Sequence, residues 1–420
     1  MIVKIAWKNM VFKPLNTILS IVLLTASVAI ISLLILLQEQ FENKFSKNIE
    51  GVDLVLGAQG SPLQLILSSV YQMDAPTGNI NYKEAQIWMR HPYVKKAIPL
   101  AFGDNYQGYK ILGTTEDYIQ KYDGKLESGM TFHDNFDVVL GSAVAEKMKL
   151  KPGDEFYSSH GDSKEGEVHK DFAFKVKGVL LPTGKVMDNL ILTTIESIWA
   201  VHDHHEEEET VNASDEVGNN EQHQEHEHHH EEQMVPEEDR EITAVLLQLR
   251  NKMAFVLWPR LISQNTKMQA ASPAIEINRL FTLFGFGLDA LQYLAYGIML
   301  ISGISIFIAL YNTLKERKYE FALLRVSGAS RSQLLKLVLF ESILLCVVGF
   351  IFGTVLGRIG LWLISSSTEE EYKMSFNPFA FVWEKEGILF LVTIFVGIIA
   401  ALIPAVKAYQ LNISKTLANA

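Results

Sequence analysis

The sequence predicts a membrane protein with an α-helical four-span transmembrane domain and a mixed α/β extracytoplasmic domain inserted between spans 1 and 2. Three observations predict this class. Hydrophobic residues make up 48% of the 420 residues although the stretch 202–239 is strongly polar, so apolar residues are concentrated elsewhere. They form four runs, each reaching the roughly 20 residues that a helix needs to cross about 30 Å of hydrocarbon. Between the first two runs, short β-rich segments alternate with turn signals.

The first apolar run, Thr17 to Gln38, contains no charged residue and is too long for the apolar region of a cleaved signal peptide. It is therefore expected to be an uncleaved anchor. The four runs predict spans at residues 17–38 (span 1), 288–312 (span 2), 337–364 (span 3) and 387–406 (span 4). The segments between and beside them are an N-terminal segment (1–16), an external domain (39–287) with a disordered loop (202–239), a coupling segment (313–336), an external loop (365–386) and a C-terminal tail (407–420).

The distribution of Lys and Arg predicts the orientation, because cytoplasmic loops are rich in these residues. Basic residues gather in the N-terminal segment, in the link between spans 2 and 3, and in the C-terminal tail: Lys4, Lys8, Lys13, Lys315, Arg317, Lys318, Arg325, Arg331, Lys407 and Lys415. The loop 365–386 has five acids and two bases. Both termini are therefore expected in the cytoplasm, and the large domain is expected outside.

The external domain is expected to mix strands and helices. β-rich runs flanked by turn residues predict strands within 53–58, 135–141, 172–181, 189–195 and 242–250. Helices are expected at Tyr82–Met89 and at Ser142–Met148, with Ser142 as the N-cap of the second.

Charge and motifs exclude several functional classes. The formal charge of −11 comes from 202–239, which carries fifteen acids and no Lys or Arg; the remainder has 33 acids and 37 bases, without the concentrated basic face that nucleic acid requires. The single Cys346 excludes an internal disulfide and a Cys-cluster metal site. No G-x-x-x-x-G-K-[ST] motif is present, so the chain has no phosphate-cradling loop of its own for ATP hydrolysis.

Eight of the twelve histidines lie in one acidic stretch with almost no apolar residues, and such composition predicts disorder. The candidate metal ligands are His202, His204, His205, His223, His226, His228, His229 and His230. Three interpretations stay open: a solvated acidic tract, a weak multi-site collector of Zn²⁺ or of Cu²⁺ or Ni²⁺, and a single well-formed site. The H-E-x-x-H match at 226–230 is set aside, because a run of His and Glu matches by chance and lacks apolar residues to pack a helix.

Two parts of the chain resemble permease subunits of the MacB/FtsX/LolC-LolE group of ABC transporters, the FtsX-like permeases. They are LKERKYEFALLRVSGASRSQLLKLVLFES at 314–342, and VVLGSAVAEKMKLKPGDEF with FKVKGVLLPTG at 138–184. The resemblance implies a MacB-like periplasmic core domain in a non-catalytic subunit of the bacterial inner (cytoplasmic) membrane. It also implies two copies of a partner ATPase that holds ATP and Mg²⁺, and a second permease subunit. A homodimer is expected because the chain shows no internal duplication, and the spans imply contact with membrane lipid. A periplasmic binding protein is a further expected partner, in connection with the metal link. The chain departs from the family pattern at the His-rich insert and at 52–80.

The segment 315–332 carries the candidate coupling residues. From the residues alone it is equally a rigid corner between helices or a basic loop that only sets orientation. Gly328 can adopt positive φ at a tight corner, and Ser330 can cap the following helix. The resemblance implies that the segment couples to the ATPase through Lys315, Glu316, Arg317, Lys318, Tyr319, Glu320, Phe321, Leu324, Arg325, Gly328, Ala329 and Ser330.

Span 3 carries Gly349, Gly353 and Gly357 on one helix face, which permits close backbone approach. Packing within one subunit and contact between two permeases both fit this spacing. Glu341 near the cytoplasmic end of the span is either a functional carboxylate or the partner of a base such as Lys336 or Arg331.

The expected function is a permease that transmits ATP-driven motion to its external domain, with a link to zinc or another transition metal through the His-rich loop. Two alternatives are kept. One is extraction of lipoproteins or lipids from the membrane, as in LolC and LolE. The other is an FtsX-like scaffold that regulates a cell-wall hydrolase and moves no cargo.

Overall fold

The computed structural model describes residues 14–159, 168–201, 240–372 and 375–411. It separates into two compact units, which are described one at a time. The helical unit comprises the described parts of Met1–Asn43 and Thr282–Ala420, and the α/β unit comprises those of Lys44–Phe281. The predicted disordered loop 202–239, with all eight candidate metal-ligating histidines, lies outside the described residues.

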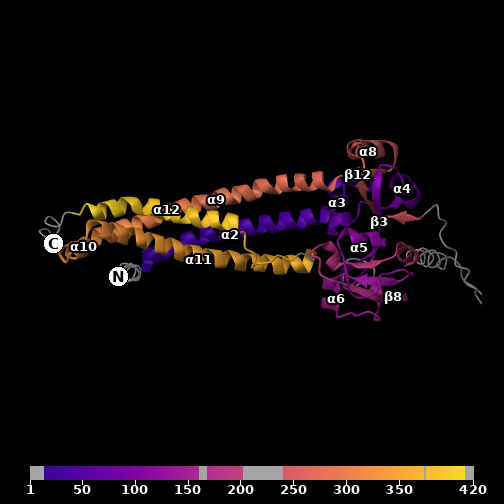
Figure 1. Ribbon diagram of the computed structural model, residues 1–420, viewed down its shortest axis with the longest axis horizontal. Coiled ribbons are helices and arrows are strands. Elements are labelled where there is room, and N and C mark those ends of the chain that lie inside the picture. Colours follow the sequence, from indigo (N-terminus) through magenta and orange to yellow (C-terminus); the bar gives the residue numbers. More distant parts are fainter. Residues whose placement is uncertain (1–13, 160–167, 202–239, 373–374, 412–420) are drawn as a thin grey trace, which may run out of the picture. The chain divides into compact units, whose positions relative to one another are not determined.

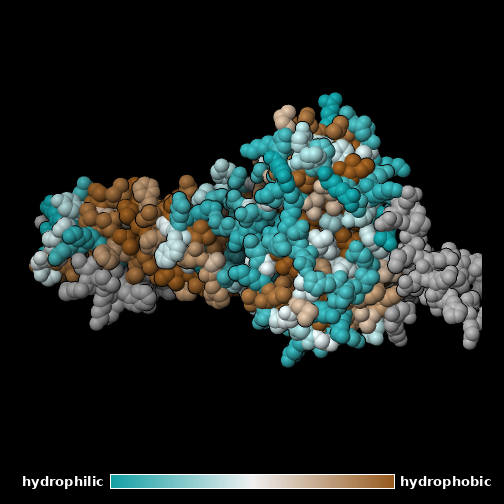
Figure 2. Space-filling model, turned by 45° about the vertical axis from the view of Figure 1, so that its right-hand side comes forward, coloured by the Kyte–Doolittle hydropathy of each residue, from teal (hydrophilic) through white to brown (hydrophobic). Residues whose placement is uncertain are grey.

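The helical unit is built from α2 (Pro14–Ile49), α9 (Pro273–Glu316), α10 (Lys318–Val326), α11 (Arg331–Tyr372) and α12 (Trp383–Tyr409) (Figure 1). Four of these described helices, all except α10, are long and apolar enough to cross a membrane. Apolar side chains form a band around the middle of the visible surface of these helices, and hydrophilic side chains lie at the far end (Figure 2). A surface so apolar is expected against lipid rather than water. The predicted four-span membrane domain is confirmed.

The four long helices extend beyond the apolar runs that predicted them. Helix α9 has 44 residues, and at about 1.5 Å per residue it is roughly twice as long as the hydrocarbon core is thick. Hydropathy locates only the part of a helix that crosses lipid, because the further turns mix polar and apolar residues. The boundary between the two units falls inside α2 and α9, and both are helical on each side of it.

Inside the helical unit, two hydroxyl contacts join neighbouring helices, whereas the buried hydroxyls of Ser32 and Ser302 have no hydrogen-bond partner among the described residues. The Ser20 hydroxyl lies 2.9 Å from that of Ser305, which joins α2 to α9. The Ser342 hydroxyl donates to the Gly397 carbonyl at 2.7 Å, which joins α11 to α12. A buried apolar cluster that includes Leu24 of α2 surrounds these contacts. The described helices thus form one packed bundle.

The α/β unit is built on a mixed sheet with the order β12-β1-β11-β3-β4-β9-β6-β8-β5, in which β7 pairs with β3 and β8. The strands are β1 (Leu54–Ala58), β3 (Val94–Tyr106), β4 (Tyr109–Gly113), β5 (Leu126–Gly129), β6 (Asp137–Leu140), β7 (Glu155–Ser159), β8 (Val168–Leu180), β9 (Ile191–Thr193), β11 (Ala244–Leu249) and β12 (Met268–Ala271). The short strands β2 (Ile80–Asn81) and β10 (Glu241–Ile242) pair separately. The long β3 pairs with β11, β4 and β7, and so connects both halves of the sheet.

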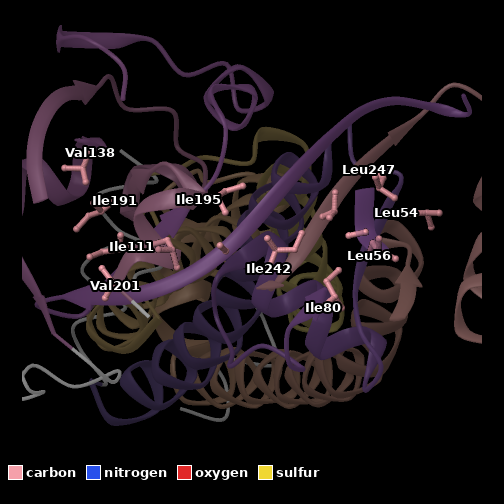
Figure 3. Packing of buried hydrophobic residues seen from close by; sticks show 14 of the residues in the cluster. Leu54, Leu56, Ile80, Ile111, Val138, Ile191, Ile195, Val201, Ile242 and Leu247 are labelled. Atoms are coloured by element: carbon pink, nitrogen blue, oxygen red, sulfur yellow. The ribbon is translucent and has the colours of Figure 1, made fainter. Parts of the chain in front are cut away.

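Helices cover the sheet and close its core. They are α3 (Pro62–Tyr71), α4 (Tyr82–Met89), α5 (Glu116–Lys121), α6 (Ser142–Met148), α8 (Lys252–Asn265) and the 3₁₀ turn η1 (Val186–Asn189). Figure 3 shows the core that they enclose, with Leu54 and Leu56 of β1 near Leu247 of β11. Ile111 of β4 and Ile191 of β9, from the other half of the sheet, belong to the same buried cluster. The core therefore runs continuously across the sheet.

Each of the five predicted strand segments contains a strand, and helices occupy Tyr82–Met89 and Ser142–Met148 as predicted. The prediction that Ser142 is an N-cap is wrong. The cap position is Gly141, which has extended φ and ψ, and its helix has no side-chain cap. A Cβ at Gly141 would lie 2.3–2.5 Å from backbone atoms of Met187 and Asp188, so this close approach selects glycine there.

Candidate functional site

The candidate coupling segment forms a short helix, α10, joined tightly to the helices on either side. Arg317 alone separates α9 from α10, and its amide N–H donates to the Thr313 carbonyl at 3.0 Å. Its guanidinium pairs with Glu320, with Nε 2.7 Å from Oε2. The connection is therefore a helical bend held by backbone and side-chain contacts.

A closed corner follows α10. Gly328 has φ of +100°, as the sequence predicted for this turn, and its N–H donates to the Arg325 carbonyl at 3.2 Å. The Ala329 N–H donates to the Leu324 carbonyl at 2.9 Å, and the Arg325 guanidinium donates to the Ala329 carbonyl at 2.5 Å. These bonds satisfy the carbonyls at the C-terminus of α10 and fix the direction in which the chain leaves it.

The next helix, α11, begins with a reciprocal cap. The Ser330 hydroxyl accepts from the Gln333 N–H at 3.2 Å, and the Gln333 side chain accepts from the Ser330 N–H at 2.8 Å. Ser330 therefore caps α11 as predicted, and Gln333 completes a capping box that the sequence analysis did not identify. Such a cap contributes about 1 kcal/mol to helix stability.

Helix α10 has two different faces. Phe321 and Ala322 are buried, and Phe321 belongs to the same cluster as the spans. Tyr319, Leu323 and Val326 are exposed and follow one another at i, i+4 and i+7, so they form one apolar stripe along the helix. We call these three residues the α10 stripe. Tyr319 is among the predicted coupling residues, whereas Leu323 and Val326 are not.

The other predicted coupling residues lie around this helix. Lys315 and Glu316 are exposed on the last turn of α9, Lys318 and Glu320 are exposed on α10, and Leu324 is half-buried. Phe321 is available only for packing because its side chain is inside the bundle. The twelve predicted coupling residues thus lie within one stretch of α9, α10 and the corner.

The glycines of span 3 face α2 of the same chain. A Cβ at Gly349 would lie 2.6 Å from a methyl carbon of Leu24, and one at Gly353 would lie 2.6 Å from Val28. A Cβ at Gly357 would lie 2.8 Å from the Ala29 carbonyl oxygen. This is close packing between spans 1 and 3 within one subunit. Glu341, in the first third of α11, is buried.

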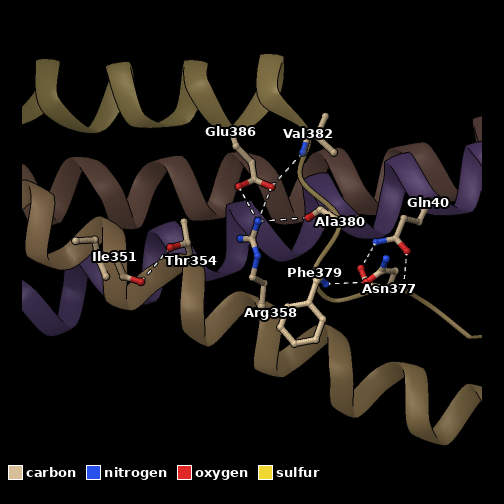
Figure 4. Close-up of polar contacts among 9 residues, drawn as sticks. All are labelled: Gln40, Ile351, Thr354, Arg358, Asn377, Phe379, Ala380, Val382 and Glu386. Carbon is tan, nitrogen blue, oxygen red and sulfur yellow. Dashed lines mark hydrogen bonds and ion pairs between the residues drawn. The ribbon is translucent and has the colours of Figure 1, made fainter.

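A buried ion pair joins Arg358 in the second half of α11 to Glu386 in the first turn of α12. The guanidinium Nη2 of Arg358 lies 3.0 Å from both carboxylate oxygens of Glu386, whose side chain is 1% exposed (Figure 4). The same nitrogen donates to the Ala380 carbonyl at 3.4 Å, and the Val382 N–H donates to Glu386 at 3.4 Å. We call this group the Arg358–Glu386 clamp. It ties the α11–α12 loop to both helices.

The α/β unit holds the last turns of α2 through several contacts. Lys121 donates to the Asn48 carbonyl at 2.6 Å, Tyr71 donates to the Phe45 carbonyl at 2.9 Å, and the Val186 N–H donates to the Asn48 side chain at 3.0 Å. Burial, together with the nearby positive charge of Lys185, lowers the pKa of Lys121 to about 7. A cationic group at a helix C-terminus interacts favourably with the helix dipole.

No group of three or more His, Cys, Asp or Glu side chains that could hold a metal ion occurs among the described residues. The eight predicted ligands fall within 202–239, which the structure does not describe. The metal hypothesis therefore stays a prediction from sequence.

Comparison with known proteins places the helical unit in a family. Residues 293–413 match the family model described as FtsX-like permease C-terminal. A segment of 121 residues is 26% identical to the macrolide export ATP-binding/permease protein MacB of Agrobacterium fabrum. That segment is 29% of this chain and 18% of the relative, so the chain matches less than a fifth of the relative's length.

Two solved structures are similar to this chain at low scores. The periplasmic region of MacB from Actinobacillus actinomycetemcomitans has a TM-score of 0.33 and 11% identity, covering 56% of this chain and 97% of that one. The extracellular domain of the ABC-type transporter YknZ from Gram-positive bacteria has a TM-score of 0.28 and 13% identity, covering 52% and 99%. The chain is therefore a multi-pass membrane protein whose residues 293–413 match the FtsX-like permease C-terminal family model.

Proposed function

We propose that this chain is the permease subunit of an ABC transporter, and that α10 receives the motion of a separate ATPase subunit. The α10 stripe carries this proposal. Three large apolar side chains at helical spacing lie exposed on a short helix whose opposite face is buried. An apolar stripe flanked by charges is typical of a helix that docks into a groove of a partner protein. The MacB relative is named an ATP-binding/permease protein, so it combines both parts in one chain. In this proposal, the present chain corresponds to the permease part.

The proposal requires α10 to move its neighbours rather than swing freely. The Arg317–Glu320 pair, the Gly328 corner and the Ser330–Gln333 capping box fix α10 between α9 and α11. A displacement of α10 is therefore passed directly to both helices. Because α9 and α2 are helical on both sides of the unit boundary, they are suited to carry the motion to the α/β unit. This transmission is the mechanical output that we propose.

The complete complex in this proposal contains two permeases and two ATPases in the inner membrane, with both termini and α10 in the cytoplasm. The basic residues of the N-terminal segment, the α9–α11 link and the C-terminal tail support that orientation. ATP and Mg²⁺ are bound by the ATPase. Lipoprotein extraction and control of a cell-wall hydrolase are alternative outputs of the same motion, and release of lipoprotein in an ATP-dependent assay would distinguish extraction.

The test is capture of the ATPase by the tagged full-length chain. The wild-type chain should copurify with a protein that carries the G-x-x-x-x-G-K-[ST] motif. Leu323→Asp should weaken this capture by about tenfold or more, because burying an unpaired charge in an apolar contact costs more than 1.4 kcal/mol. Leu257→Asp is the matched control, since Leu257 on α8 is 54% exposed and Leu323 is 46% exposed. Absence of any such ATPase, or equal losses for both variants, would contradict the proposal.

We also propose that 202–239 gathers Zn²⁺ at several weak sites and so links transport to metal. Support comes from composition alone: eight imidazoles and many carboxylates in one stretch, both of which are zinc ligands. Deleting residues 202–232 should remove most Zn²⁺ binding measured by calorimetry on the purified chain. Replacing the eight histidines by asparagine, with the acids retained, separates imidazole ligation from attraction to negative charge. If the asparagine variant binds as much Zn²⁺ as the wild type, the histidines are not ligands.

A further inference from the structure

The loop between α11 and α12 exposes large aromatic side chains. Phe379 is 87% exposed, Trp383 is 80% exposed, and Phe381 is 48% exposed. The rings of Phe381 and Trp383 meet edge to face with centroids 4.4 Å apart. A cluster of such rings on a connecting loop is unfavourable in water, so an apolar or amphipathic environment is expected around it.

Several backbone groups of this loop are hydrogen-bonded to side chains of the protein. Phe376 bonds to Ser365 through both its N–H, at 2.7 Å, and its carbonyl, at 3.1 Å. Asn377 likewise bonds to the Gln40 side chain through its N–H, at 2.7 Å, and its carbonyl, at 2.9 Å. The Phe379 N–H donates to the Asn377 side chain at 2.9 Å.

The Arg358–Glu386 clamp binds the Ala380 carbonyl and the Val382 N–H (Figure 4), and the Ala380 N–H donates to the Asn377 carbonyl at 3.3 Å. A non-helical segment can enter a membrane only when its backbone polar groups have partners within the protein. A loop that stays in water has no such requirement. The loop thus combines many hydrogen-bonded backbone groups with exposed rings, and this combination suits the boundary between lipid and water, where the remaining polar groups can meet water or headgroups.

The charges at the base of the loop are compensated as well. Arg358 pairs with Glu386, and Lys385 lies 2.7 Å from Glu39 of α2. The helix surfaces that continue from the loop are apolar, with Trp362 exposed on α11 and Ile388 and Leu391 exposed on α12. These faces belong to the apolar surface that the spans present to lipid. The aromatic cluster therefore extends a lipid-facing surface rather than forming an isolated patch.

From these observations we infer that Phe379, Phe381 and Trp383 form a lipid anchor, which inserts into the interfacial region of the leaflet at the α11–α12 loop. The occupant is phospholipid, at the level where headgroups meet acyl chains. Aromatic rings are favoured at this depth of a bilayer. The anchor fixes the depth of α11 and α12, and the contacts of Gln40 and Glu39 extend this restraint to α2. This inference does not depend on an ATPase partner.

Depth-dependent quenching of a fluorophore on the full-length chain tests the anchor. The only cysteine, Cys346, is buried, so a Cys346→Ser background allows one NBD label at Phe379→Cys. The chain is placed in phosphatidylcholine nanodiscs that contain a nitroxide either near the headgroup or deep in the acyl chain. Leu391→Cys is the deep reference on α12, and Glu127→Cys on the exposed strand β5 is the aqueous reference.

The label at 379 should emit at shorter wavelength than the label at 127, and the shallow nitroxide should quench it more than the deep one. The order of quenching should reverse at 391. A label at Trp383→Cys must repeat the result at 379, which guards against a local effect of one substitution. Quenching by aqueous iodide equal to that at 127 would place the loop in water. Protection from both iodide and nitroxide would place it against protein, such as a second copy of the chain, and either result overturns the inference.

Discussion

Arg358→Met is expected to destabilise the helical unit by about 3–5 kcal/mol, because it leaves the carboxylate of Glu386 buried without its cation. Glu386 is almost fully buried, and Arg358 contacts both of its oxygens at 3.0 Å. The substitution also removes the donor to the Ala380 carbonyl. Methionine keeps much of the side-chain volume, so the loss reflects charge more than packing. Thermal unfolding of the full-length chain in detergent measures the effect.

A second variant and a control distinguish the contribution of the Arg358–Glu386 ion pair to stability from the general effect of substituting an arginine. Arg358→Met combined with Glu386→Leu should be more stable than Arg358→Met alone, because it removes the uncompensated charge. Arg279→Met is the control: Arg279 is largely exposed and lies 4.0 Å from Glu276, so its loss should change stability by less than about 1 kcal/mol. An Arg358→Met chain that unfolds at the wild-type temperature would show that the pair contributes nothing to stability.

The main features of this fold could be predicted because they depend on local composition. A run such as Thr17 to Gln38, without a charge, indicates a span whatever surrounds it. The short continuous apolar runs at Leu54–Ala58 and Ala244–Leu249 are equally local signals. The order of strands in the sheet could not be predicted, because β1 pairs with β11 and β12, which lie far along the chain.

The N-cap of α6 shows how a distant contact defeats a local rule. Serine is a favoured N-cap, so Ser142 was the expected cap. The chain instead places Gly141 at that position, directly against the backbone of Met187 and Asp188. Nothing near residue 141 in the sequence reveals that approach.

In the candidate coupling site, too, some features could be predicted from neighbouring residues and others depend on distant contacts. The positive φ of Gly328 and the cap by Ser330 follow from neighbouring residues, and both were predicted. Which face of α10 is exposed depends on how α9 and α11 pack around Phe321, so the exposure of Leu323 and Val326 could not be predicted. The available signal was the position of Leu323 and Val326 four and seven residues after Tyr319. The Arg358–Glu386 clamp was missed because its partners lie on different helices.

The second large effect is expected at the glycines between α2 and α11. Gly353→Ala should destabilise the bundle by about 1–3 kcal/mol, because the added methyl overpacks a closed contact. Its carbon would lie 2.6 Å from Val28 and 3.0 Å from the Thr25 carbonyl oxygen. The carbonyl belongs to the backbone of α2 and cannot rotate away, so the two helices must separate. Unfolding of the full-length chain in detergent again gives the measurement.

Gly360→Ala is the matched control, since Gly360 lies on the same helix and its added methyl would meet only Leu33 at 3.7 Å, an ordinary contact. Alanine is a better helix former than glycine by about 1 kcal/mol, so this variant should be as stable as the wild type or more stable. The two substitutions are chemically identical, and opposite signs would therefore isolate the close approach of spans 1 and 3. If both variants stabilise the chain, α2 and α11 do not pack at Gly353 as described. If Gly353→Ala alone destabilises the chain, the face of α11 that carries Gly349, Gly353 and Gly357 packs directly against α2. In the proposed mechanism, a displacement passed from α10 to α11 would then also move α2.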